Sequence, residues 1–230
     1  MTATQRPAAP PAPIRVMVVD DQELFVYGMR MLIESQPDFE FVGSSTDGAE
    51  AVRVVAESRP DVVLMDIRMP VMNGIEATRR ITRPDGATDA STVRVVVLTT
   101  FQQEEAVFQS MKHGASAFVT KDATPELLLQ TIRSVHAGDA PPSALAELVK
   151  RNVVSASTDA PEEAIAALTP REREIFLLAA KGMRNSEIAA AAFVSEATVK
   201  THVRSILAKL GLETRAQIVV HAYENRLMTF

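Results

Sequence analysis

Five polar residues follow four short apolar segments of this sequence, and their types suit phosphoryl chemistry. They are Asp20 and Asp21 after 14–19, Asp66 after 62–65, Thr99 after 93–98 and Lys121 after 117–120. Crowded carboxylates repel one another unless a cation joins them, and Mg²⁺ accepts such hard oxygen ligands. A carboxylate can also attack a phosphoryl donor, while a metal and an ammonium group offset the charge on the phosphoryl oxygens. Brought together, these residues would form a magnesium-assisted phosphoryl acceptor.

The four segments must be neighbouring strands of one sheet for these residues to meet. Apolar, β-branched runs alternate with helical patterns five times over about 125 residues. The runs are 14–19, 39–44, 62–65, 93–98 and 117–120, and the helical patterns are 24–35, 49–58, 74–81, 104–113 and 125–137. This alternation predicts an α/β fold with a flavodoxin-like, doubly wound, five-stranded parallel sheet of order 2-1-3-4-5.

Ligands of such sheets bind at the carboxyl ends of the strands. In the order 2-1-3-4-5 the four segments that end in candidate residues are contiguous, and the edge strand ends in the uncharged Ser44 and Ser45. A simpler explanation exists for single residues, because Asp at a strand-to-helix junction is often an N-cap, as Asp21 could be. Five candidates at four adjacent strand ends favour a common cleft.

The composition and the predicted secondary structure change after residue 138. Residues 139–164 are rich in Pro, Ala and Ser, which predicts a linker with a short helix at 143–151. Residues 165–230 show helical patterns only, at 170–181, 186–192, 196–210 and 215–225. We therefore expect a disordered tail at 1–13, an α/β domain at 14–138, the linker, and a small all-α domain at 165–230.

Composition narrows the class of protein. The sequence has no Cys, which excludes disulfide scaffolds and cysteine-based zinc sites or nucleophiles. The longest unbroken apolar run, 188–194, is far too short for a membrane span, and residues 1–13 lack the hydrophobic region of a secretory signal. We expect a cytoplasmic protein with no membrane partner. The formal net charge of -5 divides unevenly, with +3 on residues 165–230, which favours an anion-binding C-terminal domain.

The segment 196–210 has two distinct helical faces. Val199, Val203, Ile206 and Leu210 form an apolar stripe. The opposite face carries two cations, a hydroxyl, two small residues and no acid: Ala197, Lys200, Thr201, Arg204 and Ala208. Such a helix suits the DNA major groove, although an ordinary solvated face has a similar pattern. Ser195 is the expected N-cap and Gly211 the expected residue after the C-terminus.

The preceding segments complete a helix-turn-helix. Thr169, Pro170 and Glu172 form a capping box that opens a helix, and a short helix at 186–192 then leads into 196–210. Arg184 stands where a Ser or Thr would cap the short helix, so we expect the capping box with Glu187 to be lost and Asn185 to cap instead.

The first domain resembles the receiver domain of two-component response regulators over residues 14–138. The resemblance is carried by Val18-Val19-Asp20-Asp21, Met65-Asp66-Ile67-Arg68-Met69-Pro70 with Gly74, Leu98-Thr99, and Gly114 to Lys121. It implies that Asp66 is the phosphoacceptor and that Mg²⁺ binds Asp20, Asp21, Asp66 and the Arg68 main-chain carbonyl. It also implies that Thr99 and Phe118 are switch residues and that Lys121 contacts the phosphate.

The second domain is similar to the LuxR-type DNA-binding domain, which places the chain among NarL/FixJ-type response regulators. The matching motifs are Leu168 to Glu174, Asn185 to Ala189, Ser195 to Val203, and Lys209 to Gly211. The resemblance implies base or phosphate contacts by Lys200, Thr201 and Arg204, and backbone contacts by Thr198, His202 and Lys209. It further implies a sensor histidine kinase, promoter DNA and homodimerisation on phosphorylation.

Two alternatives stay open. A constitutive DNA-binding regulator with a vestigial receiver would keep the fold without the switch, although the complete set of acidic, hydroxyl and ammonium residues argues against it. A phosphohydrolase of the haloacid dehalogenase type needs a second acid two residues after its nucleophile, where this chain has Arg68. We therefore expect a regulator, not an enzyme.

Overall fold

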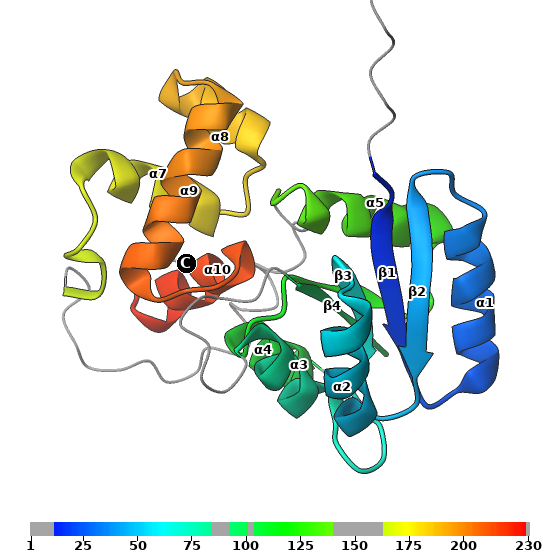
Figure 1. Ribbon diagram of the computed structural model, residues 1–230. Coiled ribbons are helices and arrows are strands. Elements are labelled where there is room, and N and C mark those ends of the chain that lie inside the picture. The colour runs from blue at the N-terminus through cyan, green and yellow to red at the C-terminus, as the bar shows by residue number, and fades with distance from the viewer. Residues whose placement is uncertain (1–11, 84–92, 101–103, 140–162, 229–230) are drawn as a thin grey trace, which may run out of the picture.

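The computed structural model describes residues 12–83, 93–100, 104–139 and 163–228 (Figure 1). The helix expected at 143–151, most of the expected tail and most of the linker lie outside these residues. Residues 84–92, between the third helix and the fourth strand, also lie outside them.

Five parallel strands form one sheet in the order β2-β1-β3-β4-β5, as the sequence predicted. The strands are β1 (Ile14–Val19), β2 (Phe39–Ser45), β3 (Val62–Asp66), β4 (Arg94–Thr99) and β5 (Ala117–Thr120). β3 is buried along its whole length, since helices cover both faces of the sheet. Three expected carboxyl ends move by one residue, so that Ser45, Asp66 and Thr99 are the last residues of their strands.

Helices cover the two faces in groups. They are α1 (Glu23–Glu34), α2 (Gly48–Ser58), α3 (Gly74–Thr82), α4 (Glu104–Lys112) and α5 (Pro125–His136). The apolar sides of α1 and α5 form one core cluster with the sheet, and those of α2, α3 and α4 form the other. This arrangement leaves the carboxyl ends of the strands uncovered by helices.

The C-terminal elements are helical throughout the described residues. They are η1 (Glu163–Ile165), a 3₁₀ turn that the sequence did not predict, and α7 (Pro170–Ala180), α8 (Asn185–Ala192), α9 (Glu196–Leu210) and α10 (Arg215–Glu224). Their buried side chains form a third cluster centred on Ile175, Phe176, Ile188 and Ile206. The predicted helix-turn-helix is therefore present as α8 and α9.

Most of the expected helix ends are confirmed. The Thr169 hydroxyl accepts from the Glu172 N–H while a Glu172 carboxylate oxygen accepts from the Thr169 N–H, which completes the capping box. Ser195 caps α9, and Gly211 follows it in the left-handed conformation, with φ 65°. At α5 the Thr124 hydroxyl accepts from the Leu127 N–H, and Pro125 is the first helical residue, which is a favourable helix start.

The expected cap of α8 was wrong. Arg184 has no acceptor atom, but its N–H still donates to Glu187 Oε2 at 2.6 Å, so half of the capping box is kept. Asn185 does not cap the helix. Its own N–H donates to Asp139 Oδ1 at 3.0 Å and its side chain accepts from Arg215, which are contacts between distant parts of the chain that no local pattern reveals.

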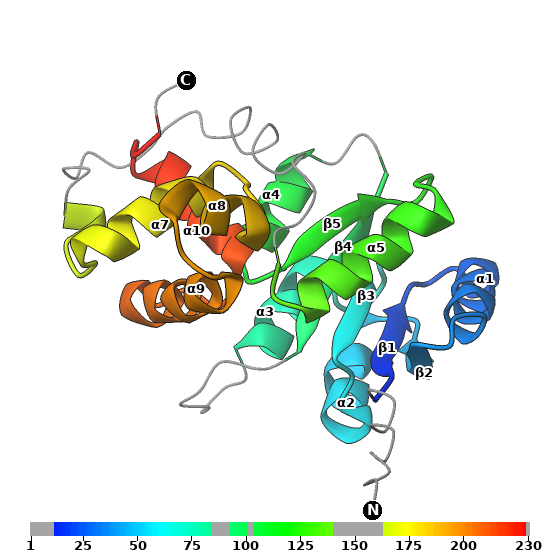
Figure 2. The same ribbon diagram turned by 90° about the horizontal axis from the view of Figure 1, so that it is seen from above.

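The C-terminal domain lies against the α3–α4 side of the first domain, with α10 next to α4 (Figures 1 and 2). Among the helices of the described residues, none is both long and apolar enough to cross a membrane.

Candidate functional site

The three acids predicted to form a site do meet at the carboxyl ends of the strands. Asp20 follows β1 and Asp66 ends β3, which is its direct neighbour in the sheet. One carboxylate oxygen from each of Asp20, Asp21 and Asp66 lies within 4.8 Å of the others. Asp20 and Asp66 are buried, whereas Asp21 is exposed. The pairing of β1 with β3 therefore creates a compact acidic cluster from residues 45 and 46 positions apart.

Lys121 joins two of these acids. Its Nζ lies 2.7 Å from Asp20 Oδ2 and 2.9 Å from Asp66 Oδ1. The backbone brings it there, because the Lys121 N–H donates to the Thr99 carbonyl at 2.8 Å and so continues the β4–β5 pairing. Burial acts to lower the pKa of Lys121, but the bonds to Asp20 and Asp66 outweigh it and raise that pKa above its ordinary value. The side chain therefore stays an ammonium ion.

Asp66 is held by further bonds. Its Oδ2 accepts the Arg68 N–H at 3.1 Å. Burial raises the pKa of Asp66 above its usual range, and the nearby Asp20 carboxylate adds to this, while Lys121 and the Arg68 N–H act in the opposite direction. The carboxyl is thus fixed in orientation in a poorly solvated place, as a reacting group requires.

Asp21 is not used as a helix cap. The N-cap of α1 is Gln22, which makes no side-chain cap bond, and the Gln22 N–H donates to Asp20 Oδ1 at 3.0 Å. The interpretation of Asp21 as an N-cap therefore has no support, and its exposed carboxylate contributes an oxygen to the acidic cluster.

Gly74 allows the loop after Asp66 to close tightly. A Cβ at this position would lie 1.9 Å from the Asp66 carbonyl oxygen, which is far inside van der Waals contact. The Gly74 N–H donates to the Ile67 carbonyl at 2.9 Å, and α3 starts there. The glycine in the sequence motif is therefore needed for the backbone approach that shapes the site.

The two switch candidates lie on β4 and β5. Thr99 is buried at the end of β4, and its hydroxyl donates to the Thr100 carbonyl at 3.0 Å. Phe118 is partly buried and packs in the core cluster shared by α2, α3 and α4. Phe118 thus connects β5 to the helices on that face of the sheet, whereas Thr99 stands at the carboxyl end of β4, the strand next to β3.

The cluster fits a hard divalent cation. It offers three carboxylates from one sheet edge, and these oxygen donors, together with water, are the ligands that Mg²⁺ accepts. Asp21, the exposed member, leaves the cluster open to solvent, so that a metal could keep waters or take phosphoryl oxygens. The Arg68 main-chain carbonyl belongs to the same β3–α3 connection.

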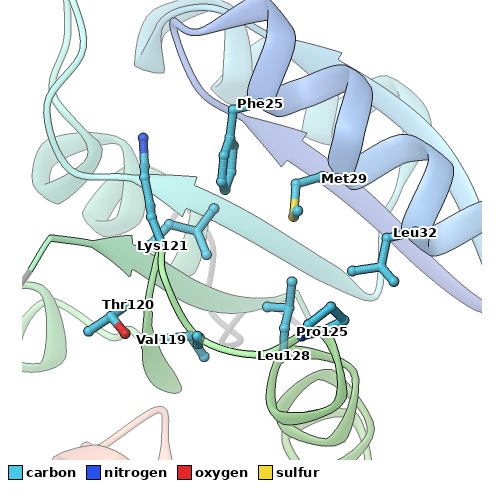
Figure 3. Close-up of a pocket in the computed structure, with 10 residues that line it drawn as sticks. Phe25, Met29, Leu32, Val119, Thr120, Lys121, Pro125 and Leu128 are labelled. Atoms are coloured by element: carbon cyan, nitrogen blue, oxygen red, sulfur yellow. The ribbon is translucent and has the colours of Figure 1, made fainter.

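One neighbour of the site was missed by sequence reasoning. The Lys121 Nζ lies 4.9 Å from the centre of the Phe25 ring, a cation–π distance. Phe25, Met29 and Leu32 of α1 line a small apolar pocket with Val119, Pro125 and Leu128 from β5 and α5, and Lys121 stands at its edge (Figure 3). The only sequence signal was an aromatic residue on the inner side of the first helix.

The predicted DNA-reading face of α9 is open to solvent. Val199, Val203 and Ile206 are buried in the C-terminal core, whereas Lys200, Thr201 and Arg204 are exposed. Ala197 and Ala208 are exposed on the same side. The buried apolar residues and the exposed cationic residues therefore lie on different faces of α9, as the sequence predicted.

The flanking DNA-contact candidates differ from one another. Thr198 and His202 are partly exposed, and the Thr198 hydroxyl is 2.8 Å from the Ser195 hydroxyl. Lys209 is already engaged, since its Nζ donates to Glu172 Oε2 at 2.6 Å. Its charge stabilises the packing of α9 on α7, which the sequence did not indicate.

Comparisons with known proteins agree with this geometry. The family model described as "Response regulator receiver domain" matches residues 16–133, and that of "Bacterial regulatory proteins, luxR family" matches residues 166–222. The chain is 37% identical over 217 residues to the transcriptional regulatory protein LiaR of Bacillus subtilis (strain 168), covering 94% of this chain and 99% of LiaR.

Solved structures show the same fold. A LuxR-family two-component response regulator from Aurantimonas sp. SI85-9A1 has a TM-score of 0.54 and 35% identity, covering 62% of this chain and 99% of that one. The response regulator ChrA of a heme-sensing two-component system has a TM-score of 0.51 and 29% identity, covering 95% of this chain and all of ChrA. The chain therefore belongs to the response regulators of the NarL/FixJ type, with a receiver domain followed by a LuxR-type DNA-binding domain.

Proposed function

We propose that this response regulator accepts a phosphoryl group on Asp66 from the phosphohistidine of a sensor histidine kinase, and that phosphorylation promotes binding to promoter DNA as a dimer. The observation that carries the proposal is the contact of one ammonium group, Lys121, with both Asp20 and Asp66 beside a third carboxylate. The protein would meet both the kinase and the promoter DNA in the cytoplasm.

The transfer is a substitution at phosphorus. A carboxylate oxygen of Asp66 forms a bond to phosphorus while the P–N bond of the donor breaks; the imidazole nitrogen keeps the electron pair and takes a proton from water. Lys121 is placed to move its contact from the free carboxylate to a phosphoryl oxygen. No general base is required, because the attacking group is an anion.

Asp20, Asp21, Asp66 and the Arg68 main-chain carbonyl would hold Mg²⁺. The bound ion would offset the negative charge of the phosphoryl oxygens, which three carboxylates would otherwise repel. Asp20 is additionally oriented by the Gln22 N–H, and Asp66 by the Arg68 N–H.

The response would start at Thr99. Its hydroxyl, now bonded to the Thr100 carbonyl, would turn to a phosphoryl oxygen, and Phe118 would follow inward. The α4–β5–α5 face would shift between two states that differ by a few kcal/mol. On DNA, Lys200, Thr201 and Arg204 would face the major groove, with Thr198 and His202 near the backbone.

Phosphorylation can be tested with the full chain, Mg²⁺ and a small phosphodonor such as acetyl phosphate. Intact mass spectrometry should show one added phosphoryl group, lost on treatment with hydroxylamine as an acyl phosphate is. Asp66→Asn should not be labelled, whereas Asp122→Asn, an exposed carboxylate beside Lys121, should be labelled like the parent.

The same samples test the switch. Sedimentation of the protein should show more dimer after labelling. Titration with DNA selected from a random library should show tighter binding after labelling. Continued labelling of Asp66→Asn would overturn the assignment of the acceptor. Equal DNA affinity with and without the phosphodonor would support a constitutive regulator instead.

A further inference from the structure

The Lys121 ammonium has a third neighbour besides its two carboxylates. Its Nζ lies 2.7 Å from Asp20 Oδ2, 2.9 Å from Asp66 Oδ1 and 4.9 Å from the centre of the Phe25 ring. An ammonium group has three N–H donors, and the two carboxylates account for two of them. The face of an aromatic ring carries partial negative charge and attracts a cation at this distance. The Phe25 ring is therefore an electrostatic partner of Lys121 and not only a packing neighbour.

Helix α1 turns the Phe25 ring toward the site. Phe25 is partly buried and packs against the core cluster of α1, α5 and the sheet, whereas the preceding Leu24 is 84% exposed. Met29 of α1 and Pro125 of α5 line one small apolar pocket together with Phe25 and Lys121 (Figure 3). Because apolar side chains hold the ring, it keeps its place when the ammonium moves.

Lys121 is poorly hydrated where it meets the ring. Its side chain is 15% exposed, and the side chain of its partner Asp20 is fully buried. Cation–π attraction is weak for a hydrated ammonium and stronger for one that has lost most of its water. The contact between Lys121 and Phe25 therefore belongs to the stronger kind.

The two carboxylates cannot keep their hold on the ammonium throughout the proposed phosphoryl transfer. Asp66 is the proposed acceptor, and Asp20 and Asp66 both belong to the acidic cluster that fits Mg²⁺. A carboxylate oxygen that bonds to phosphorus or to a metal loses much of its attraction for Lys121. The ring takes up no oxygen of the site, and an ammonium that is less neutralised by carboxylates attracts it more strongly. An interaction that strengthens toward the transition state raises the rate of the step.

We propose that Phe25 is a positioning residue of the phosphoryl-transfer site: the face of its ring holds the Lys121 ammonium beside Asp66 while the carboxylates change partners. The proposal rests on the proposed function. Phe25 would touch neither the phosphoryl group nor the metal, and it would act through the place and the orientation of Lys121. Helix α1 thereby takes part in chemistry that is carried by residues at the strand ends.

Fluorinated phenylalanines at position 25 test this role with almost no change in the size of the side chain. Each ring fluorine withdraws electron density from the ring face and so weakens its attraction for a cation. In the full chain with saturating Mg²⁺, the rate of labelling by acetyl phosphate should fall stepwise as one, two and three fluorine atoms are added to the ring. Phe25→Leu, which has no ring, should be labelled roughly fivefold more slowly than the parent, which corresponds to about 1 kcal/mol.

Met29→Leu is the matched control. Met29 lies one helical turn after Phe25 and lines the same pocket, but it has no ring to face the ammonium. This variant should be labelled at the parental rate. A loss of rate in Met29→Leu equal to that in Phe25→Leu would show that packing in the pocket, and not the ring face, is responsible.

NMR of the protein without Mg²⁺ checks the contact separately from the reaction. Protons that lie over a ring face are shifted upfield, so the Lys121 ε-methylene resonance should be upfield of its usual position in the parent and in Met29→Leu, and should return toward that position in Phe25→Leu. Equal labelling rates across the fluorinated series, or an unchanged Lys121 resonance in Phe25→Leu, would overturn the proposal. A parent that is not labelled at all would instead refute the proposed function, while a labelled parent with equal rates across the series refutes only the role of Phe25.

Discussion

At the scale of single residues, Glu172 shows how one carboxylate can hold a small domain together. Its two oxygens accept from the Thr169 N–H, the Ser205 hydroxyl and the Lys209 ammonium, so it connects the start of α7 with the end of α9. Its side chain is almost fully buried. The Lys209 and Ser205 bonds, with the Thr169 N–H, lower the pKa of Glu172 far below its ordinary value of 4.5.

Glu172→Gln should therefore destabilise the DNA-binding domain at neutral pH, by about 1–3 kcal/mol for bonds to a buried charge. Because the folded-state pKa is depressed, this stabilisation is complete above the ordinary value of 4.5 and is lost as the pH falls toward the folded-state pKa. Denaturant unfolding of both proteins at several pH values should show a gap that shrinks in acid. Glu174→Gln, which removes a more exposed partner of Arg171, is the control and should change little. A gap that persists unchanged at low pH would contradict this assignment.

At the scale of elements, the turn between α8 and α9 contains a strained residue. Phe193 follows α8 in the left-handed conformation, with φ 54° and ψ 47°, and its side chain is 94% exposed. That conformation costs a side chain with a Cβ roughly 1–2 kcal/mol, and an exposed ring gains little packing to offset it. Asn tolerates the conformation better, because its short side chain bonds locally.

Phe193→Asn should raise the free energy of unfolding by about 0.5–1 kcal/mol through relief of this strain. Phe193→Ala is the matched control, since it removes the ring but keeps the unfavourable conformation, and it should give no such gain. The denaturant midpoints of the three proteins measure the difference. Equal midpoints for the Asn and Ala variants would show that the backbone conformation is not the cause.

At the scale of the whole molecule, charge is divided between the domains. The chain carries a net charge of -5, yet α9 presents the exposed cations Lys200 and Arg204 with no exposed acid between them. A DNA complex formed through these cations must release counterions from the phosphates, which makes its affinity depend on salt. The acidic receiver would repel DNA that approached from its own side.

Lys200→Ala should reduce the slope of log affinity against log salt by about 0.9, the value for one phosphate contact. Arg53→Ala, which removes an exposed cation from α2 of the receiver, should leave the slope unchanged. DNA titrations at several salt concentrations give the slopes. An identical slope for Lys200→Ala and the parent would exclude a phosphate contact by Lys200.

Patterns local in sequence determined much of this protein. The alternation of β-branched runs with helical segments predicted the sheet and its helices, and polar residues directly after those runs predicted which side chains would meet. The capping signals at Thr169, Ser195 and Gly211 were confirmed, because caps depend on residues three or four positions apart. The two faces of 196–210 followed from helical periodicity alone.

Only the tertiary structure decided the contacts between distant elements. The cover on α10, the pairing of Lys209 with Glu172 and the Asn185–Asp139 bond join residues from 37 to more than 100 positions apart, and no periodicity records such pairs. Ala216, Val219, Val220 and Tyr223 of α10 pack in one cluster with α4, but a helical pattern at 215–225 does not show which element covers these side chains. Burial is non-directional, so packing of the whole chain was needed to show that α10 is covered by α4 while the reading face of α9 stays exposed.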